Sequence, residues 1–390
     1  MIKPSKRSKI PPFLALENLQ KAKALEEKGA SIIHLEIGQP SSPAPKIVIQ
    51  ALADALSDPE AHGYTVAQGL PELRDAISHH YKSTYDYALT PDDIAVTVGS
   101  STAFALAFMA AFDEGDCIAL PTPGYPAYRN LMMAMGITPV ALPARAEQGW
   151  MPSLKEMEKW DKLPDGLIVA SPHNPTGVIL TNDQLKEVCH WCDVNQVRLI
   201  SDEIYHGLSY DKPTTTAAHH TDNAFIISGF SKYFSMTGWR LGWMVMPKDL
   251  QDTISSLIAN LYISAPTPNQ IGAIKAFAAK EELDANLQRY QVNRDILLKG
   301  LSPKFLGNAA PADGAFYLYA DVSALTNNSM EFADELLERT GVAVTSGMDF
   351  DKEQGRFYVR LSFAGSTEDM HEAVQRINHY VDGILPKAMP

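Results

Sequence analysis

Cysteine is scarce in this chain, with three residues among 390. So few thiols exclude a disulfide framework and indicate a reducing compartment, so we expect a cytoplasmic protein. Long hydrophobic runs are also missing: no apolar segment reaches the length needed to cross a bilayer, which predicts no membrane association. The basic start, MIKPSKRSKIPPF, has no continuous apolar segment behind it, which argues against a secretory signal. We interpret this start as a solvated arm.

Positive charge is outweighed as well. Asp and Glu exceed Lys and Arg so far that the formal net charge is −13. Such an acidic surface repels phosphate backbones, so nucleic acid is not an expected partner. Hydrophobic residues make up 45% of the chain and charged residues 20%, the ordinary balance of a globular protein.

Two of the three cysteines form a C-x-x-C, at Cys189 and Cys192. A redox pair would open a helix after a strand, and a zinc site would need a second pair of ligands. Here the motif lies inside TNDQLKEVCHWCDVNQV, which has the pattern of an amphipathic helix capped by Thr181 or Asn182. We therefore interpret both cysteines as helix-packing residues.

Short β-branched runs alternate with helical patterns along most of the chain. This alternation is typical of an α/β fold, with a mostly parallel sheet flanked by helices. Five of the six predicted strands lead into polar or Gly/Pro-rich stretches, and ligands of open α/β sheets bind beyond the carboxyl ends of strands. The sequence therefore predicts one crevice at that edge of the sheet. The predicted strands are 92–98, 116–121, 166–172, 197–202, 224–230 and 242–247.

The pattern changes near residue 283. A long polar helix, ELDANLQRYQVNRDILLKGL, precedes two strand-like runs, GAFYLYADV and RFYVRLSFA, that are separated by a helix. This arrangement predicts a smaller α+β domain, which the helix LENLQKAKALEEKG and the strand IIHLEI near the N-terminus would join. We predict a large domain over 46–282 and a small domain made of 1–45 and 283–390.

The strongest chemical signal is SGFSKYFSMTGWRLG, residues 228–242. Lys232 follows an apolar strand, so its ammonium would lie at the strand mouth, where it is costly unless it is paired or covalently used. Arg240 stands inside an otherwise apolar run, and its planar guanidinium suits a fixed phosphate. Taken alone, Lys232 could equally be an ordinary surface lysine.

This segment resembles the lysine signature of the class I and II aminotransferases, which are pyridoxal-phosphate (PLP) enzymes of fold type I. The positions that carry the resemblance are Gly229, Ser231, Lys232, Arg240 and Gly242. The resemblance implies that Lys232 forms the Schiff base to PLP and later moves a proton, that Arg240 binds the cofactor phosphate, and that Ser231 also contacts the cofactor. Many relatives carry a phosphate-binding serine where this chain has Gly229, so that contact must come from elsewhere.

Three further residues are candidates for the ring of the cofactor. Asp202 ends a buried strand, where an ionised carboxylate needs a cationic partner, although it could also cap a helix. The resemblance implies that Asp202 pairs with the protonated pyridine nitrogen. It also implies that Asn174, in SPHNPTG, and Tyr205 both hydrogen-bond the phenolate oxygen, and that Tyr125, in PTPGYPAY, stacks on the ring. Without the resemblance, the N-P-x-G sequence at Asn174 would commonly be just a turn.

A strand-to-helix junction supplies candidates for the phosphate. Backbone N–H groups and hydroxyls at a helix N-terminus form an anion cradle, and the junction after Gly99 carries Ser100, Ser101 and Thr102. The resemblance implies that these three bind the phosphate. It also implies that Tyr64, in HGYTVAQGLPELR, reaches the phosphate of a neighbouring subunit, so we expect a homodimer with shared active sites.

Substrate contacts are expected from two more segments. Arg360 stands on an otherwise apolar strand, and the resemblance implies that it binds the substrate α-carboxylate, whereas the alternative is a solvated arginine at a strand edge. Gly38, in IGQP, matches the loop that closes over the substrate, and Asn174 would also face it. No second arginine stands out for a distal carboxylate, so we expect a broad or neutral/aromatic preference. The candidates for side-chain recognition are Gln39, Tyr64, Tyr262 and Tyr317.

The predicted function is transfer of an amino group between an α-amino acid and a 2-oxo acid by a ping-pong mechanism. A PLP-dependent lyase or synthase would use the same residues and stays open as the alternative. A PLP-binding transcription regulator is disfavoured, because it would need an N-terminal DNA-binding domain and a less acidic chain. A nicotinamide-binding domain is disfavoured because no G-x-G-x-x-G follows a strand.

Overall fold

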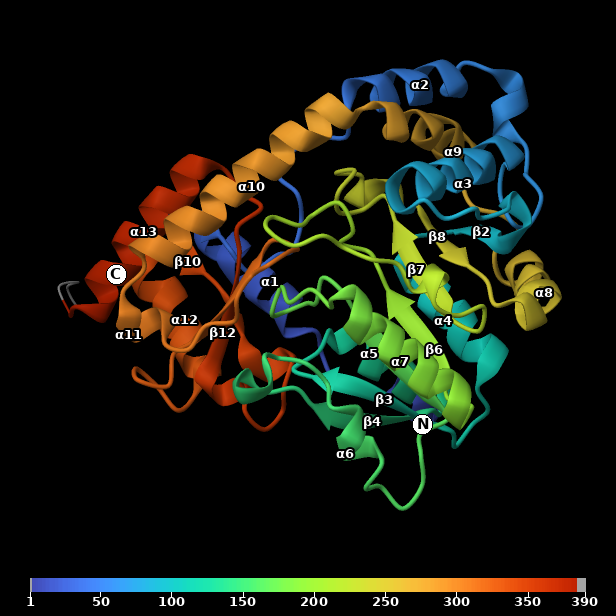
Figure 1. Cartoon of the computed structure of the whole chain (residues 1–390). Coiled ribbons are helices and arrows are strands. Elements are labelled where there is room, and N and C mark those ends of the chain that lie inside the picture. Colours follow the sequence, from blue (N-terminus) through green and yellow to red (C-terminus); the bar gives the residue numbers. More distant parts are fainter. Residues whose placement is uncertain (1, 384–390) are drawn as a thin grey trace.

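A seven-stranded sheet forms the centre of the computed structural model, which describes residues 2–383 (Figure 1). Six strands are parallel, and β8 alone runs antiparallel to both of its neighbours. All six predicted strands are confirmed, and the edge strand β4 was missed because its TPVALP sequence holds two prolines. The spatial order is β2 (Ile94–Thr97), β8 (Gly242–Val245), β7 (Phe225–Gly229), β6 (Arg198–Asp202), β5 (Gly166–Ala170), β3 (Cys117–Thr122) and β4 (Thr138–Pro143).

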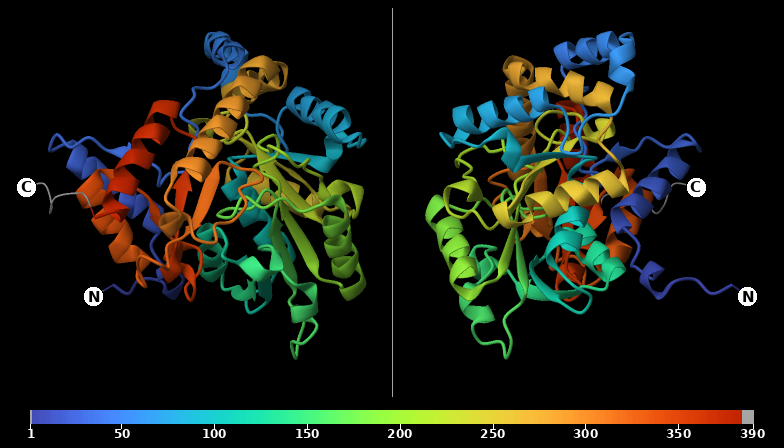
Figure 2. Two further views of the ribbon diagram at one scale, coloured as in Figure 1. Left: turned by 60° about the vertical axis from the view of Figure 1, so that its left-hand side comes forward. Right: turned by 90° about the vertical axis from the view of Figure 1, so that its right-hand side faces the viewer.

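Helices cover both faces of this sheet (Figure 2). One face packs against a cluster that includes Leu185 and Val188, and the other against a cluster that includes Phe104 and Phe108. Helix α4 is apolar nearly all round because it contacts β7 and β8 on one side and α5 and α8 on the other. The helices of this large lobe are α2 (Lys46–Leu56), α3 (Pro71–Tyr85), α4 (Ser100–Ala111), α5 (Pro126–Met135), α6 (Leu154–Met157), α7 (Asn182–Asn195), α8 (Gln251–Leu261) and α9 (Thr267–Ile274).

The two cysteines of the C-x-x-C lie on the buried face of α7. Cys189 and Cys192 are free thiols that pack into the core of the sheet, and burial raises the pKa of Cys189 to about 12. Thr181 caps the helix in a reciprocal pair with Gln184. Residues 2–383 contain no group of three or more His, Cys, Asp or Glu side chains that could hold a metal ion. The burial of both thiols in the core of the sheet confirms the helix-packing interpretation.

A smaller lobe is built mainly from the C-terminal part of the chain. Its sheet has the order β11 (Thr345–Ser346), β12 (Tyr358–Ser362), β9 (Tyr317–Asp321), and β1 (Ile33–His34) pairs in parallel with β10 (Val342–Ala343). The predicted N-terminal strand thus joins C-terminal residues, whereas the predicted domain boundaries themselves stay a prediction. The helices are α1 (Leu14–Glu26), α10 (Lys280–Gly300), α11 (Pro303–Leu306), α12 (Ser329–Thr340) and α13 (Thr367–Val381).

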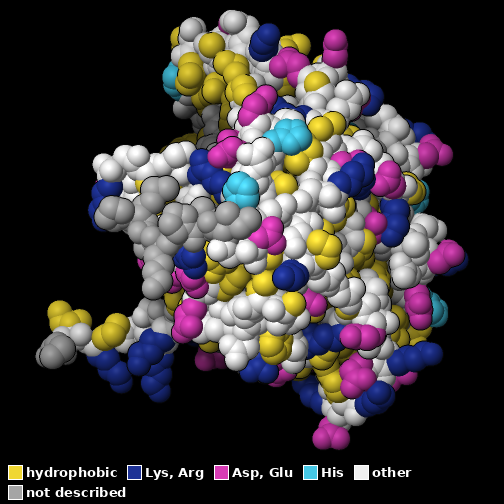
Figure 3. Space-filling model, turned by 90° about the vertical axis from the view of Figure 1, so that its left-hand side faces the viewer, with side chains coloured by type: hydrophobic (Ala, Val, Ile, Leu, Met, Phe, Trp, Pro, Cys, Tyr) yellow, Lys and Arg dark blue, Asp and Glu magenta, His cyan; other side chains and the backbone are white. Residues whose placement is uncertain are grey.

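The first described residues of the basic N-terminal segment project from the body of the molecule (Figures 2 and 3), whereas residues 6–8 contact α5 and Arg7 pairs with Glu114 over 3.2 Å. Residues 2–10 are exposed, as expected for a solvated arm, but Ile10 and Phe13 also line a cavity. The arm interpretation is wrong for those two residues, because the chain turns back onto the protein there: the Asn130 amide donates to Pro11 O over 3.4 Å. None of the helices within the described range is long and apolar enough to span a membrane.

Candidate active site

A cavity of about 570 Å³ lies at the carboxyl ends of the parallel strands, between the two lobes. Five of its lining residues follow or end five different strands of the large sheet: Ser100 after β2, Tyr125 after β3, Asn174 after β5, Asp202 at the end of β6 and Lys232 after β7. Parallel strands bring their carboxyl ends to one edge, so residues far apart in the sequence meet there. The predicted convergence on one crevice is confirmed.

Lys232 is the half-buried cation at the centre of this cavity. Its Nζ donates to Gly38 O over 2.7 Å and lies 5.7 Å from the ring centre of Tyr205. Burial, followed by the positive field of Arg360, lowers the pKa of Lys232 to about 8, even though Asp202 acts in the opposite direction. The unprotonated amine, which a nucleophile or proton acceptor requires, is therefore far more accessible near neutral pH than in an ordinary lysine.

Asp202 is a buried carboxylate on the inner wall. Its Oδ1 accepts the N–H of Ile204 over 3.0 Å, and its Oδ2 accepts the hydroxyl of Tyr128. Burial raises the pKa of Asp202 to about 6, although both hydrogen bonds oppose the shift. No Lys, Arg or His within the described residues lies within 4 Å of it, so the carboxylate is a buried acceptor to which a cationic ligand would be complementary.

A second group of lining residues combines a helix N-terminus with a guanidinium. Ser100 and Ser101 open α4, where the first N–H groups of a helix have no partner within it. Gly99 has φ +75°, and a Cβ at this position would lie 2.6 Å from Arg240 Nη2. A side chain at position 99 would therefore fill the space between the helix and the guanidinium. Ser231 lines the same cavity.

Arg360 lies in the middle of the three-stranded sheet, only 3% exposed. Its Nη1 donates to Asn174 Oδ1 over 3.0 Å and its Nη2 donates to Glu36 O over 2.7 Å, whereas its Nε has no hydrogen-bond partner among the described residues. Within residues 2–383, no carboxylate forms an ion pair with it. The solvated-arginine alternative is thus wrong, and a buried guanidinium without a counter-ion suits a carboxylate ligand.

Most of the predicted residues meet in this cavity, but three do not. Thr102 donates its hydroxyl to Val98 O, which directs it away from the cavity. Tyr64 is 80% exposed, and Tyr262 lies elsewhere, so neither contributes to the cavity of its own subunit. The predicted residues that line it are Gly38, Gln39, Ser100, Ser101, Tyr125, Asn174, Asp202, Tyr205, Ser231, Lys232, Arg240, Tyr317 and Arg360.

Several lining residues were missed by the sequence analysis. Tyr128 follows Tyr125 by three residues in PTPGYPAY, the spacing that places two residues on one face of a helix, so its position was a usable signal. Thr237 lines the cavity from the turn before Arg240. Phe13 packs edge-on against Tyr125 at 5.9 Å between ring centres, a contact that no local pattern predicts.

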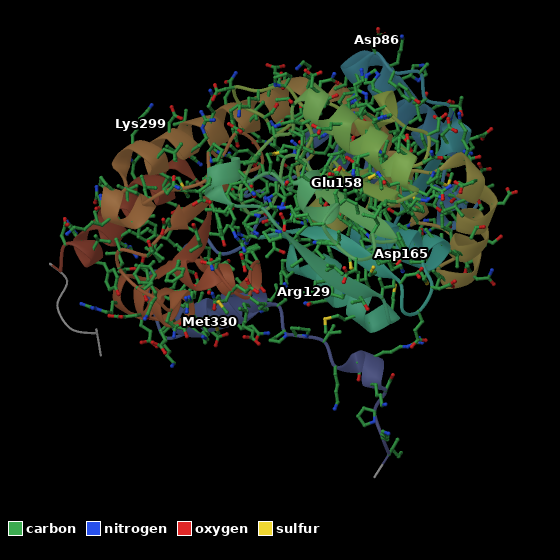
Figure 4. All side chains as sticks on the ribbon, turned by 60° about the horizontal axis from the view of Figure 1, so that its bottom comes forward. Asp86, Arg129, Glu158, Asp165, Lys299 and Met330 are labelled. Atoms are coloured by element: carbon green, nitrogen blue, oxygen red, sulfur yellow. The ribbon has the colours of Figure 1, made fainter. Side chains whose placement is uncertain are left out.

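One wall of the cavity is apolar and contains no charge of its own. Asp349 fixes this wall by accepting the N–H of Ala15 over 3.3 Å at the start of α1. Arg129, labelled in Figure 4, does not line the cavity, because it donates to Asp349 O over 3.2 Å. The residues of this apolar wall are Ile10, Phe13, Leu16, Ile37, Phe104, Ala127, Leu131 and Ala134.

Comparisons with known proteins agree with this geometry. Residues 30–377 match the family described as Aminotransferase class I and II. A valine–pyruvate aminotransferase from Mycobacterium tuberculosis is 43% identical over 379 residues, which cover 96% of this chain and 97% of that protein. The crystal structure of an aminotransferase from Mycobacterium tuberculosis is 41% identical, with a TM-score of 0.96 over 98% of this chain and all of the other. An aspartate aminotransferase from Thermus thermophilus, solved with maleate, is 29% identical with a TM-score of 0.91 over 97% of this chain and all of the other.

Proposed function

The chain belongs to the class I and II aminotransferases, and from this premise we propose that it binds PLP in the cavity and acts on α-amino acids with neutral side chains. The protein is an enzyme that transfers an amino group between an amino acid and a 2-oxo acid. Its family uses PLP. The observation that carries the proposal is the joining of three groups in one cavity: the amine of Lys232, the buried carboxylate of Asp202 and the anion cradle at Arg240.

The residues present fit this cofactor. PLP has a phosphate, a pyridine nitrogen that can carry a proton, and a phenolate oxygen. Arg240, Ser100 and Ser101 would hold the phosphate at the N-terminus of α4, where a Cβ at Gly99 would intrude. Asp202 would hold the proton on the ring nitrogen, because a buried carboxylate is complementary to a cation.

The ring would lie between these two ends. Tyr125 is the aromatic residue in position to stack on it, and Asn174 and Tyr205 would hydrogen-bond the phenolate oxygen. Two of these residues already have partners in the protein: Asn174 Oδ1 accepts from Arg360, and the Tyr205 hydroxyl contacts that of Tyr317. Each retains further hydrogen-bonding capacity for a ligand, the amide N–H₂ of Asn174 and the second lone pair or proton of Tyr205.

The reaction needs a base that acts at the substrate Cα. Bound PLP supplies a carbonyl carbon that joins to amines and a ring that accepts electrons from Cα. With its pKa lowered to about 8, Lys232 Nζ would take the proton from the substrate Cα and would return it to the carbonyl-derived carbon of the cofactor. Arg360 binds and orients the substrate α-carboxylate, while Asp202 holds a proton on the ring nitrogen and so maintains the ring as an electron acceptor.

A neutral substrate side chain is supported by the charges of the cavity. Three cationic side chains line it, and each already has a role in the proposed chemistry, since Lys232 acts at the reacting carbon, Arg240 at the phosphate and Arg360 at the α-carboxylate. None of the remaining described residues that line the cavity could neutralise a second carboxylate, whereas the wall from α1 and α5 is apolar. An acidic side chain would therefore lose its hydration without gaining a partner.

Half-reaction spectra test both parts of this proposal. We expect valine, leucine and alanine to convert the visible band of the cofactor-loaded protein at least about 10-fold more efficiently than aspartate, which corresponds to about 1.4 kcal/mol. Absence of any visible band after incubation with PLP would contradict the cofactor assignment. Preference for aspartate or glutamate in the presence of the band would contradict only the proposed side-chain class.

We also propose a homodimer with shared active sites. Tyr64 is highly exposed, and Val66, Leu261 and Ile263 also expose apolar side chains, so this region is suited to covering by a second chain. We expect sedimentation equilibrium to give twice the mass of the 42.8 kDa chain. A monomer at micromolar concentration that retains full activity would contradict the reach of Tyr64 into a neighbouring site.

A further inference from the structure

Two buried tyrosines share one hydrogen bond at the floor of the cavity. The hydroxyl oxygens of Tyr205 and Tyr317 lie 2.8 Å apart, and both residues line the cavity. Burial raises the pKa of both phenols, of Tyr205 well above its usual value, so both are protonated at neutral pH. Two hydroxyls then hold two protons, and only one of these can lie between the two oxygens. The other proton is free to be donated elsewhere.

Three contacts hold the Tyr317 side chain in position. Its ring lies 4.3 Å from the guanidinium carbon of Arg360, a cation–π contact. Its hydroxyl presses against the backbone of Gly38, where a Cβ would lie 1.7 Å from the hydroxyl oxygen. Gly38 therefore has to be a glycine while Tyr317 keeps this position. Among the hydrogen bonds of the described residues, the Tyr317 hydroxyl has Tyr205 as its one partner.

We propose that Tyr317 is a positioning residue, which donates its hydrogen bond to Tyr205 and so directs the Tyr205 proton toward the phenolate oxygen of bound PLP. This inference rests on the proposed cofactor. A phenolate is a stronger acceptor than a phenol, so the Tyr205 proton goes to the cofactor and the Tyr317 proton occupies the contact between the two tyrosines. A hydroxyl that accepts a hydrogen bond also becomes a better donor.

Tyr317 connects the residue proposed to bind the substrate with residues proposed to act on the cofactor. Tyr317 contacts Arg360 through its ring and Tyr205 through its hydroxyl, and it abuts the Gly38 backbone that accepts from Lys232. The residue proposed to bind the substrate carboxylate and the residue proposed to tune the cofactor are thus held by one side chain. Phenylalanine at 317 would keep the contact with Arg360 and remove only the hydroxyl.

The experiment is a pH titration of the visible band of the cofactor-loaded protein. A hydrogen bond to the phenolate oxygen reduces the negative charge that this oxygen presents to the nitrogen through which Lys232 would join the cofactor. That nitrogen then holds its proton less tightly, and its pKa falls. Tyr317→Phe should weaken that bond and raise the midpoint of the titration by about half a pH unit. Tyr205→Phe should raise it further, and adding Tyr317→Phe to Tyr205→Phe should change nothing more, because Tyr317 acts through Tyr205.

Tyr319→Phe is the matched control. Tyr319 lies two residues along the same strand and is equally buried, but its hydroxyl has no hydrogen-bond partner in the described part of the chain and does not line the cavity. Its variant should titrate as the wild type does. Tyr317→Met, a second variant without the hydroxyl, serves if the phenylalanine variant folds poorly.

The outcomes separate this inference from the proposed function. A wild-type protein without a visible band would overturn the cofactor assignment itself. A normal band whose midpoint is unchanged in Tyr317→Phe and Tyr317→Met would overturn the role of Tyr317 alone. The role would also be overturned if Tyr317→Phe raised the midpoint as much in the Tyr205→Phe variant as in the wild type. Tyr317 would then influence the cofactor without Tyr205.

Discussion

Replacing Lys232 with alanine is expected to abolish the visible band of the PLP-loaded protein and to lower amino-group transfer by at least about 10⁴-fold. The amine is proposed to serve twice, first as the group that joins covalently to the cofactor and then as the base that moves the substrate Cα proton. Within the described part of the chain, Lys232 is the one lysine that lines the cavity. Absorbance spectra and single-turnover measurements with an amino acid check both effects.

Lys299→Ala provides the control for this variant. Lys299 lies on the outer side of α10 (Figure 4), and it pairs with Asp295 over 2.8 Å at the surface. Its loss should leave spectrum and rate unchanged, because an exposed pair of this kind contributes little. A normal visible band in Lys232→Ala would contradict the covalent role, and a normal band combined with wild-type turnover would contradict the whole assignment.

Replacing Asp202 with asparagine is expected to lower the rate of Cα proton removal by about 10²–10³-fold while leaving the fold intact. Asparagine has nearly the same volume, and its amide oxygen can still accept from Ile204 N or from the Tyr128 hydroxyl. The negative charge that would hold a proton on the pyridine nitrogen is lost. Circular dichroism checks the fold, and stopped-flow half-reactions check the rate.

The pH dependence of cofactor retention gives a second measurement on Asp202. In the cofactor-free protein the pKa of Asp202, about 6, lies above that of an unfolded aspartate, so the fold favours the neutral carboxyl. Its contribution to the free energy of unfolding is therefore lost as the pH rises through 6. A bound pyridinium reverses the preference, since it requires the ionised form. We therefore expect PLP to bind more weakly as pH falls below about 6, and this dependence to be absent in Asp202→Asn.

Glu203→Gln is the matched control for Asp202→Asn. Glu203 is the adjacent buried carboxylate, but it faces away from the cavity and accepts the N–H of Ala217 over 2.8 Å and the Ser201 hydroxyl over 3.1 Å. Its neutral variant should retain near-normal half-reaction rates. If Asp202→Asn instead turned over at the wild-type rate, or if both variants lost rate equally, the proposed role of Asp202 would be untenable.

The class of fold and the chemistry were predictable from the sequence. Strand runs followed by polar turns identify the sheet and the edge at which ligands bind, since period-2 runs and turn residues are local properties of the chain. The spacing between Lys232 and Arg240 is local as well, and this is why the segment alone indicates an aminotransferase. The edge strand β4 was missed because its prolines argue against a strand, and only pairing with β3 places it in the sheet.

Which residues face one another depends on the folded chain. Tyr317 and Tyr205 are 112 positions apart, and Arg360 meets Asn174 across 186 positions, so no local pattern could relate them. The N-terminal segment has the sequence of a solvated arm, yet Phe13 contacts Tyr125 and closes the apolar wall. The side-chain class of the substrate depends on that wall, because it is set by burial and charge in a cavity that exists only once distant segments of the chain have packed together.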